Sequence, residues 1–245
     1  FKQKTAYEML RSLVGSEMCI RDSCNKNRKL LAELSDLYVK GKISLSAVEF
    51  LQIVKGSMIF PQEEYNLLLE KFLKNLKKEE NILSEASQMK NKSKILITGT
   101  VMDDLSMAKV IEDYGGKVVF VDMCTGNRWF QDQSKISEMK HINNNDPLRS
   151  LAEYYLNKIP CPRMMNLEKR WEYLLKIIRG YQVKGVIFYN LKFCDTSMFE
   201  LPLLREKLQR YKIPSLCLEG EFVPSNSGRI KTRIQAFLEV LEFAR

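Results

Sequence analysis

The chain has 245 residues, of which 45% are hydrophobic and 28% charged, values close to those of ordinary globular proteins. They exclude a wholly disordered chain and allow one or two domains with a sizeable core. The formal net charge of +9 makes nucleic acid a partner to consider. However, residues 1–92 hold 16 basic and 12 acidic residues, and residues 93–245 hold 23 basic and 18 acidic residues. Because the excess is spread evenly, without a basic tail or block, we predict a solvated surface and no nucleic-acid partner.

Membrane proteins and disulfide-rich secreted proteins are also disfavoured. No apolar run approaches the roughly 18 residues that a membrane-spanning helix needs, so we expect no membrane partner. The six cysteines are widely spaced without a CxxC pair, and nothing resembles a secretory signal. We therefore predict a reducing, cytoplasmic location without a disulfide framework. The single histidine, His141, lies in a polar stretch, which argues against a Ser/His/Asp triad or a histidine-rich metal site.

The beginning of the chain is unusual. It starts at Phe1 rather than at Met, which suggests a piece of a longer protein, and residues 10–23 (LRSLVGSEMCIRDS) resemble translated sequencing-adapter sequence. On this interpretation residues 1–23 are a non-native segment, Cys19 is foreign, and natural sequence begins near Cys24. The alternative is an ordinary short amphipathic helix.

Residues 24–92 have the periodicity of helices. Apolar side chains fall on one helical face in two stretches: Leu30, Leu31, Leu34, Leu37 and Tyr38 in the first, and Tyr65, Leu68, Leu69, Phe72, Leu73 and Leu76 in the second. We expect Gly41, Gly56 and Pro61 to separate these helices and the Glu/Lys-rich residues 77–94 to form a solvated linker. This region is predicted to pack as helices and to contribute no catalytic group.

Between residues 93 and 245, buried strands alternate with helices. Apolar runs predict strands at 94–98, 117–121, 185–189 and 214–218, and the intervening periodicity predicts helices at 105–114, 147–157, 167–179, 198–211 and around 230–241. Such alternation produces a parallel sheet that is covered on both faces. The predicted fold class is therefore α/β: a C-terminal Rossmann-like parallel sheet of about four strands with helices on both faces, preceded by the helical region.

The chemistry is expected where the strands end, because open parallel sheets bind ligands in the crevice beyond their carboxyl ends. Polar, glycine-containing or cysteine-containing segments follow all four predicted strands, at 99–104, 122–128, 190–195 and 219–226. These segments place Cys124 and Cys194 at one edge of the sheet, where the two thiols are candidates for redox chemistry or metal ligation. The alternative is that both are small buried residues beside a packed loop. The chain has neither a dinucleotide-binding glycine motif nor a GxxxxGK[ST] loop.

Four segments of this part of the chain form a recognisable set: Asp122–Arg128 (DMCTGNR), Ile159–Arg163 (IPCPR), Leu191–Asp195 (LKFCD) and Gly228–Phe237 (GRIKTRIQAF). In this order and spacing they resemble the 2-hydroxyacyl-CoA dehydratase D-component family, which includes 2-hydroxyglutaryl-CoA dehydratase and benzoyl-CoA reductase subunits. The similarity covers roughly residues 25–242. The chain thus resembles a family member that is truncated at its N-terminus.

The resemblance implies two Rossmann-like domains that hold an oxygen-sensitive 4Fe–4S cluster at their interface through three cysteines. Cys194, in the LKFCD segment, corresponds to one ligand, and the other two would belong to a first α/β domain upstream that this chain lacks. Cys124 and Cys161 match positions near the cluster without being ligands. Asp195 would orient the loop or cap the following helix, and Cys217 is expected in the core.

The implied activity is radical dehydration of a 2-hydroxyacyl-CoA. A low-potential electron on the thioester carbonyl gives a ketyl radical anion, which expels the neighbouring hydroxide and acidifies the β-proton; the electron returns after that proton is lost. The implied partners are the acyl-CoA substrate, a homologous partner subunit and an ATP-dependent iron–sulfur activator protein. Two alternatives stay open: a benzoyl-CoA reductase-type subunit, and a cluster-free, non-catalytic relative that acts as an assembly subunit.

Two further groups of residues are candidates near the same edge. A glycine and three basic residues open the last predicted helix: Gly228, Arg229, Lys231 and Arg233. They are expected to bind a coenzyme A phosphate or, alternatively, to form a solvated helix end. The family more often has Gln at the position of Arg229, which weakens that part of the comparison. Glu219 and Glu221 follow the fourth strand as candidate acid/base groups or plain loop residues.

Overall fold

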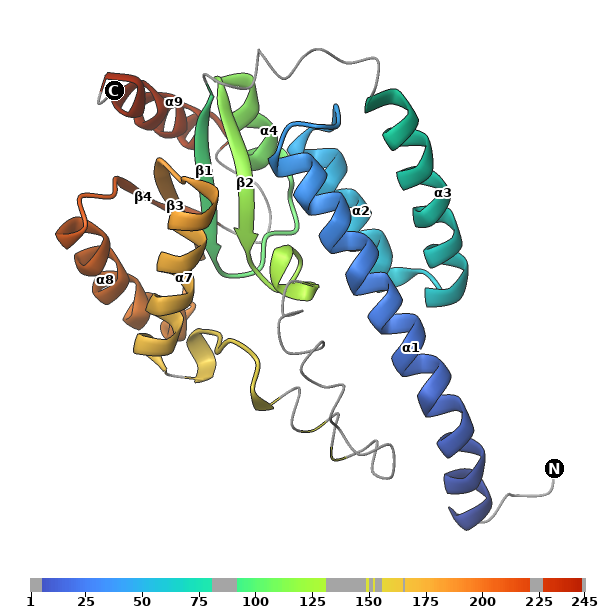
Figure 1. Cartoon of the computed structure of the whole chain (residues 1–245). Helices are drawn as coiled ribbons and strands as arrows, with labels where there is room; N and C mark the ends of the chain where they lie inside the picture. Colours follow the sequence, from blue (N-terminus) through green and yellow to red (C-terminus); the bar gives the residue numbers. More distant parts are fainter. Residues whose placement is uncertain are drawn as a thin grey trace.

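The computed structural model describes residues 6–80, 92–130, 149, 152, 156–164, 166–220 and 227–243. Its centre is a sheet of four parallel strands in the order β2-β1-β3-β4 (Figure 1). The strands are β1 (Ser93–Gly99), β2 (Gly116–Asp122), β3 (Gly185–Leu191) and β4 (Ser215–Gly220). This arrangement confirms the predicted α/β class and all four predicted strands, although each strand ends one or two residues later than predicted.

Helices cover both faces of the sheet, as predicted. One face packs against α4 (Ser106–Asp113) and α9 (Ser227–Phe243), and the other against α7 (Leu167–Tyr181) and α8 (Asp195–Arg210). Successive strand residues alternate between these two cores: Ile95 and Ile97 belong to the first and Leu96 to the second. The alternation follows from the two-residue period of side chains along a strand.

The N-terminal helices α1 (Ala6–Val39), α2 (Ala47–Ile59) and α3 (Gln62–Glu80) lie together on the β2 side of the sheet, whereas α8 lies beside β4 (Figure 1). They share one core with the first face of the sheet. Tyr38 stacks on Phe50 with ring centroids 4.9 Å apart, and Phe50 meets Phe130 edge-on at 6.4 Å. Aromatic packing therefore joins α1 and α2 to the loop that follows β2.

Two details of the helical region differ from or extend the sequence-based expectations. The sequence predicts a break at Gly56, but α2 continues through it to Ile59. The glycine is used for close packing, because a Cβ there would lie only 3.0 Å from the Tyr65 hydroxyl. At its start α2 has a reciprocal capping box, in which Ser46 and Glu49 each bind the other's backbone N–H.

Several predicted features stay predictions. Helix α1 runs without interruption from Ala6 to Val39, so a boundary at residue 23 is not marked by a change of secondary structure. His141 and most of the predicted helix 147–157 lie outside the described residues. Within the described part of the chain, no helix is long and apolar enough to cross a membrane.

Candidate functional site

The carboxyl ends of the strands form one edge of the sheet, because all four strands are parallel. The neighbours β1 and β3 are followed by helices on opposite faces, α4 after β1 and α8 after β3. The chain therefore diverges at the point between Gly99 and Leu191, where parallel α/β sheets open the crevice that binds ligands.

Backbone and side-chain hydrogen bonds tie the two diverging loops together. The Thr100 amide donates to the Tyr189 carbonyl at 2.9 Å, and the Leu191 amide donates to Thr100 Oγ1 at 2.9 Å. Gly99 has a φ of 135°, and a Cβ at this position would lie 2.1 Å from the Tyr189 carbonyl oxygen. Only glycine fits this close approach, so β1 and β3 meet here backbone against backbone.

A buried ion-pair network lies at the same end of the sheet. Arg170, from the first turns of α7, places Nη2 2.9 Å from Asp122 Oδ2 at the end of β2, and Nε 2.8 Å from Glu200 Oε2 on α8. Its Nη2 also donates to Thr98 Oγ1 at 3.0 Å, and Thr98 in turn donates to Asp122. The side chains of Arg170 and Asp122 are 1% and 0% exposed. Buried charges of this kind are tolerated when they are paired and hydrogen-bonded.

The pKa values of the network follow from burial and pairing. Burial by itself lowers the pKa of Arg170, but Asp122 and Glu200 more than offset it, so the guanidinium stays firmly charged. Burial raises the pKa of Glu200, and the nearby Arg170 opposes that rise. The net effect raises the pKa of Glu200, so its carboxylate takes up a proton more readily than an ordinary glutamate does as the pH falls.

Arg128 links this network to two of the segments that resemble the dehydratase family. It lies at the end of the DMCTGNR segment, with Nη1 3.6 Å from Asp122 Oδ1, and its Nη2 donates to the Ile159 carbonyl at 2.7 Å. Arg170 Nη1 approaches the next carbonyl, that of Pro160, at 3.5 Å. The IPCPR segment is thus attached by its backbone to the loop that follows β2.

Cys194 occupies the N-cap position of α8, where it is partly buried. Its carbonyl accepts the amides of Ser197 and Met198, and its Sγ lies 3.7 Å from Thr196 Oγ1. Cys194 makes no side-chain cap hydrogen bond, and Asp195 is the first helical residue and not the N-cap. The other predicted role of Asp195, orienting the loop, stays a prediction. The preceding Phe193 has a φ of 64° and is 95% exposed. A thiol and an apolar side chain are both presented at this edge.

The other two cysteines of the predicted site lie on neighbouring loops. Cys124 is exposed in the loop after β2, and Cys161 is partly buried before the short helix η4 (Pro162–Met164). Cys124 and Cys194 thus follow β2 and β3, at one edge of the sheet, with β1 between those strands. The described residues contain no group of three His, Cys, Asp or Glu side chains that could hold a metal ion. Ligation by Cys194 therefore stays a prediction.

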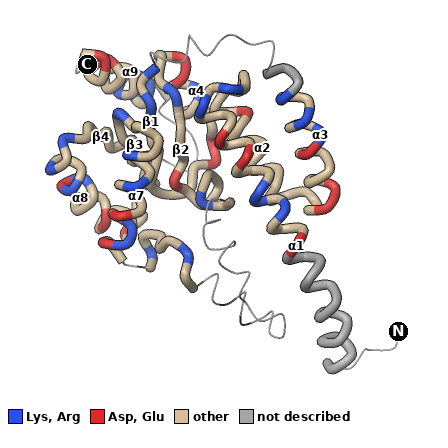
Figure 2. The backbone as a smooth tube through the Cα atoms, viewed as in Figure 1, with Lys and Arg blue, Asp and Glu red and all other residues tan. Residues whose placement is uncertain are grey.

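The predicted acid/base and coenzyme A residues have different surroundings. Glu219 is exposed but belongs to β4 and does not follow it, because pairing with β3 continues to Gly220; Glu221 lies outside the described residues. At the start of α9, Gly228, Arg229 and Lys231 are exposed. Arg233 is also exposed, but it donates to the Cys217 carbonyl at 2.8 Å. Figure 2 shows Lys and Arg interspersed with Asp and Glu along the described backbone, in agreement with the even spread of charge in the sequence.

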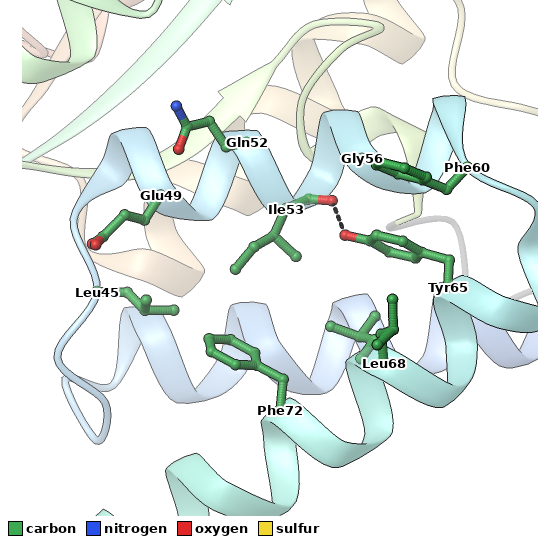
Figure 3. Close-up of a pocket in the computed structure, with 10 residues that line it drawn as sticks. Leu45, Glu49, Gln52, Ile53, Gly56, Phe60, Tyr65, Leu68 and Phe72 are labelled. Atoms are coloured by element: carbon green, nitrogen blue, oxygen red, sulfur yellow. Dashed lines mark hydrogen bonds between the residues drawn. The ribbon is translucent and has the colours of Figure 1, made fainter.

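A separate pocket of about 490 Å³ lies between α2 and α3 (Figure 3). Side chains of α2 and α3, Ile53 and Phe72 among them, point toward one another across it, and the Tyr65 hydroxyl donates to the Ile53 carbonyl. Glu49 lines the pocket, but Ser46 already hydrogen-bonds its carboxylate and lowers its pKa. The lining is otherwise largely apolar, so this pocket has no group suited to catalysis.

Arg170 is not among the site residues predicted from the sequence. Its spacing could have indicated that it is buried, because Arg170, Leu174, Ile177 and Ile178 share the buried face of α7. An arginine on an otherwise apolar helical face is unusual, since a buried arginine needs an acidic partner. That partner could not be identified from the sequence, because Asp122 and Glu200 are 48 residues before and 30 residues after it.

The chain therefore combines a parallel, Rossmann-like α/β sheet with thiol-bearing loops and a buried ion-pair network at the carboxyl edge of that sheet. The family model for the 2-hydroxyglutaryl-CoA dehydratase D-component matches residues 20–241. The chain therefore belongs to the 2-hydroxyglutaryl-CoA dehydratase D-component family, which confirms the resemblance of its four segments.

Individual relatives agree with this family. The chain is 28% identical to "Putative dehydratase subunit YjiM" of Escherichia coli (strain K12), over 98% of the chain and 61% of that protein. It is 22% identical to the (R)-phenyllactyl-CoA dehydratase beta subunit of Clostridium sporogenes, over 89% of the chain and 54% of that protein. It is 23% identical to a benzoyl-CoA reductase subunit of Thauera aromatica, over 84% of the chain and 51% of that protein. The chain thus spans roughly half to three-fifths of the length of these relatives.

Proposed function

We propose that this chain is part of the iron–sulfur subunit of a 2-hydroxyacyl-CoA dehydratase, a hydro-lyase. The observation that carries the proposal is the position of Cys194, a partly buried thiol at the N-terminus of α8 on the ligand-binding edge of the sheet, in a member of this family. The overall reaction removes the hydroxyl group from C2 and a proton from C3 of the acyl chain as water, with no net change in electrons.

Cys194 fits the role of one ligand of a 4Fe–4S cluster. The first turn of α8 presents backbone N–H groups, and a helix N-terminus favours the negative charge of a thiolate-ligated cluster. We infer that two further cysteines come from the part of the longer relatives that this chain does not span, with Cys124 and Cys161 beside the cluster. When bound, the cluster would supply a single low-potential electron, which an ATP-dependent activator protein delivers to it.

The other residues of the edge are assigned to substrate binding and proton handling. Arg229 and Lys231 are exposed at the start of α9, which follows β4 at the same edge, and could bind a phosphate of coenzyme A. Arg233 is a weaker candidate, because it already donates to the Cys217 carbonyl. Glu219, exposed near the end of β4, is a candidate carboxylate for proton transfer to the substrate.

A homologous partner subunit is also part of the proposal. The relatives are named as subunits, and two different subunits of the benzoyl-CoA reductase of Thauera aromatica are similar to this chain. Two subunits of one enzyme that share a fold are expected to pair around a pseudo-twofold axis. The same similarity makes a benzoyl-CoA reductase-type subunit the second candidate function.

The test uses the chain extended to the length of its relatives and produced without oxygen, together with its partner subunit and activator. The complex is incubated with ATP, a low-potential reductant such as dithionite, and either a 2-hydroxyacyl-CoA or benzoyl-CoA, and the thioester products are identified by mass spectrometry. We expect a 2-enoyl-CoA from the 2-hydroxyacyl-CoA. Reduction of the ring of benzoyl-CoA would support the second candidate, and no turnover of either thioester would identify a non-catalytic assembly subunit.

A further inference from the structure

We propose that Arg170 is a positioning residue: its bond to Glu200 holds the N-terminal turns of α8, and with them Cys194, in a fixed place relative to the loop after β2. This inference rests on the proposed function, because the place of Cys194 matters only if the thiol is used. It concerns residues outside the four segments that resemble the family, since Arg170 lies on α7 and Glu200 follows the LKFCD segment.

The hydrogen bonds of Arg170 connect four separate parts of the chain. Nε contacts α8 through Glu200, Nη2 contacts β2 and β1 through Asp122 and Thr98, and Nη1 approaches the Pro160 carbonyl. All three nitrogens are therefore used, and the side chain is 1% exposed. A planar guanidinium that is hydrogen-bonded through all three nitrogens has little freedom to move. Because Thr98 and Asp122 fix it to β1 and β2, its bond to Glu200 fixes Glu200 relative to the same two strands.

Few other hydrogen bonds hold the N-terminal turns of α8 in place. No side chain caps the helix at Cys194, and the residue before it has a positive φ of 64°. Pro202 lies inside α8 and lacks the N–H that would bond to the Met198 carbonyl. Ser197 Oγ donates to Asn190 Oδ1 at 2.6 Å and attaches this part of the helix to β3, and apolar residues further along α8, such as Leu204, pack in the core. Glu200 thus supplies the attachment of these turns to β2.

A second α7–α8 ion pair provides a matched control. Lys207 on α8 contacts Glu168 on α7 at 2.8 Å, the same separation as in the Arg170–Glu200 pair. Glu168 is 72% exposed, however, whereas Glu200 is 14% exposed. Exposed ion pairs fix geometry weakly, because solvent competes for both partners. Loss of Glu168 therefore removes an equivalent contact between the same two helices without releasing the buried guanidinium.

The test measures amide hydrogen exchange in the 245-residue chain for Glu200→Ala, Glu200→Gln and Glu168→Ala. We expect Glu200→Ala to speed exchange of the Ser197 and Met198 amides by about tenfold or more, while the amides of α9 stay as protected as in the parent chain. Glu200→Gln should restore most of the protection, because its amide oxygen still accepts the Arg170 Nε–H. Glu168→Ala should leave these amides unchanged.

Two outcomes would overturn the proposal: equal exchange at Ser197 and Met198 in Glu200→Ala and the parent, or a uniform increase over α8 and α9, which indicates general destabilisation. The iron content of the extended chain, purified without oxygen, separates this inference from the proposed function. Faster exchange in a protein that binds no iron supports the tether and contradicts the function. If the protein binds iron but Glu200→Ala leaves amide exchange unchanged, the positioning role of Arg170 is contradicted and the proposed function is not.

Discussion

The ammonium group of Lys117 lies 3.6 Å from the centroid of the Tyr38 ring, which joins β2 to the long helix α1. The same ammonium lies 3.6 Å from Glu112 Oε1, and the Tyr38 hydroxyl donates to the Val118 carbonyl at 2.8 Å. The Lys117 side chain is 8% exposed. A charged, largely buried contact thus forms part of the junction between the helical region and the sheet.

This junction makes stability depend on pH. Burial lowers the pKa of Lys117 to about 8, despite the opposing charge of Glu112. Between pH 8 and the ordinary lysine pKa of 10.5, the unfolded chain binds more protons at this residue than the folded chain does. The free energy of unfolding should therefore rise with pH, by about 1–2 kcal/mol at this site between about pH 7.5 and 9.5.

The measurement is urea unfolding of the parent chain and of Lys117→Met at several pH values in that range. The difference between the two isolates Lys117, and we expect Lys117→Met to lose the rise. Burial, and after it the charge of Glu112, raises the pKa of Tyr38. Above about pH 10 this tyrosine therefore ionises more readily in the unfolded chain, which lowers the free energy of unfolding, so the measurements stay below that pH. Identical pH profiles for the two proteins would contradict the prediction.

Two glycines should respond to alanine with opposite signs. At Gly99 the φ of 135° is strained for alanine and a Cβ would lie 2.1 Å from the Tyr189 carbonyl oxygen, so Gly99→Ala should lower the free energy of unfolding by about 3 kcal/mol. Gly180 lies in α7, and an added methyl group would have nothing within 4 Å, so Gly180→Ala should raise it by up to about 1 kcal/mol. Chemical denaturation at constant pH checks both. A tolerated alanine at Gly99 would contradict the close backbone approach between Gly99 and Tyr189.

The buried network at the edge of the sheet should contribute far more to stability than exposed ion pairs do. Arg170→Met leaves Glu200 without its ion-pair partner and Asp122 with only the more distant Arg128, so we expect a loss of about 3–5 kcal/mol. Lys207→Met removes an exposed pair of equal length and should cost less than about 1 kcal/mol. Urea midpoints and slopes for both variants test the contrast. Similar losses in the two variants would show that Arg170 is not an essential counter-ion.

The parts of the fold that local patterns determine could be predicted from the sequence. Each strand is a short apolar run that ends in polar residues, as in Lys94–Thr98, and this pattern is sufficient to place Cys124 and Cys194 at one edge. The pattern ends β4 too early, because pairing with β3 keeps Glu219 in the strand. Gly56 does not end a helix. It lies inside α2, where the absence of a side chain allows the ring of Tyr65 to pack closely against the helix.

The ion-pair network could not be predicted, because no local pattern joins its members. Thr98 and Arg170 are 72 residues apart, and their contact depends on the strand order and on the face to which α7 packs. A buried arginine also looks like a surface residue until its acidic partners are known. The sequence therefore identifies the edge that carries the chemistry but not the residue that organises it.

If Cys194 ligates a 4Fe–4S cluster as proposed, the iron content of the extended chain depends on this thiol. It is measured in protein produced and purified without oxygen, with and without Cys194→Ala. Cys217→Ala is the control, because Cys217 lies in β4 and packs against the core formed with α7 and α8. We expect about four iron atoms per chain in the parent and in Cys217→Ala, and a loss of most of this iron in Cys194→Ala. Unchanged iron content in Cys194→Ala would contradict it.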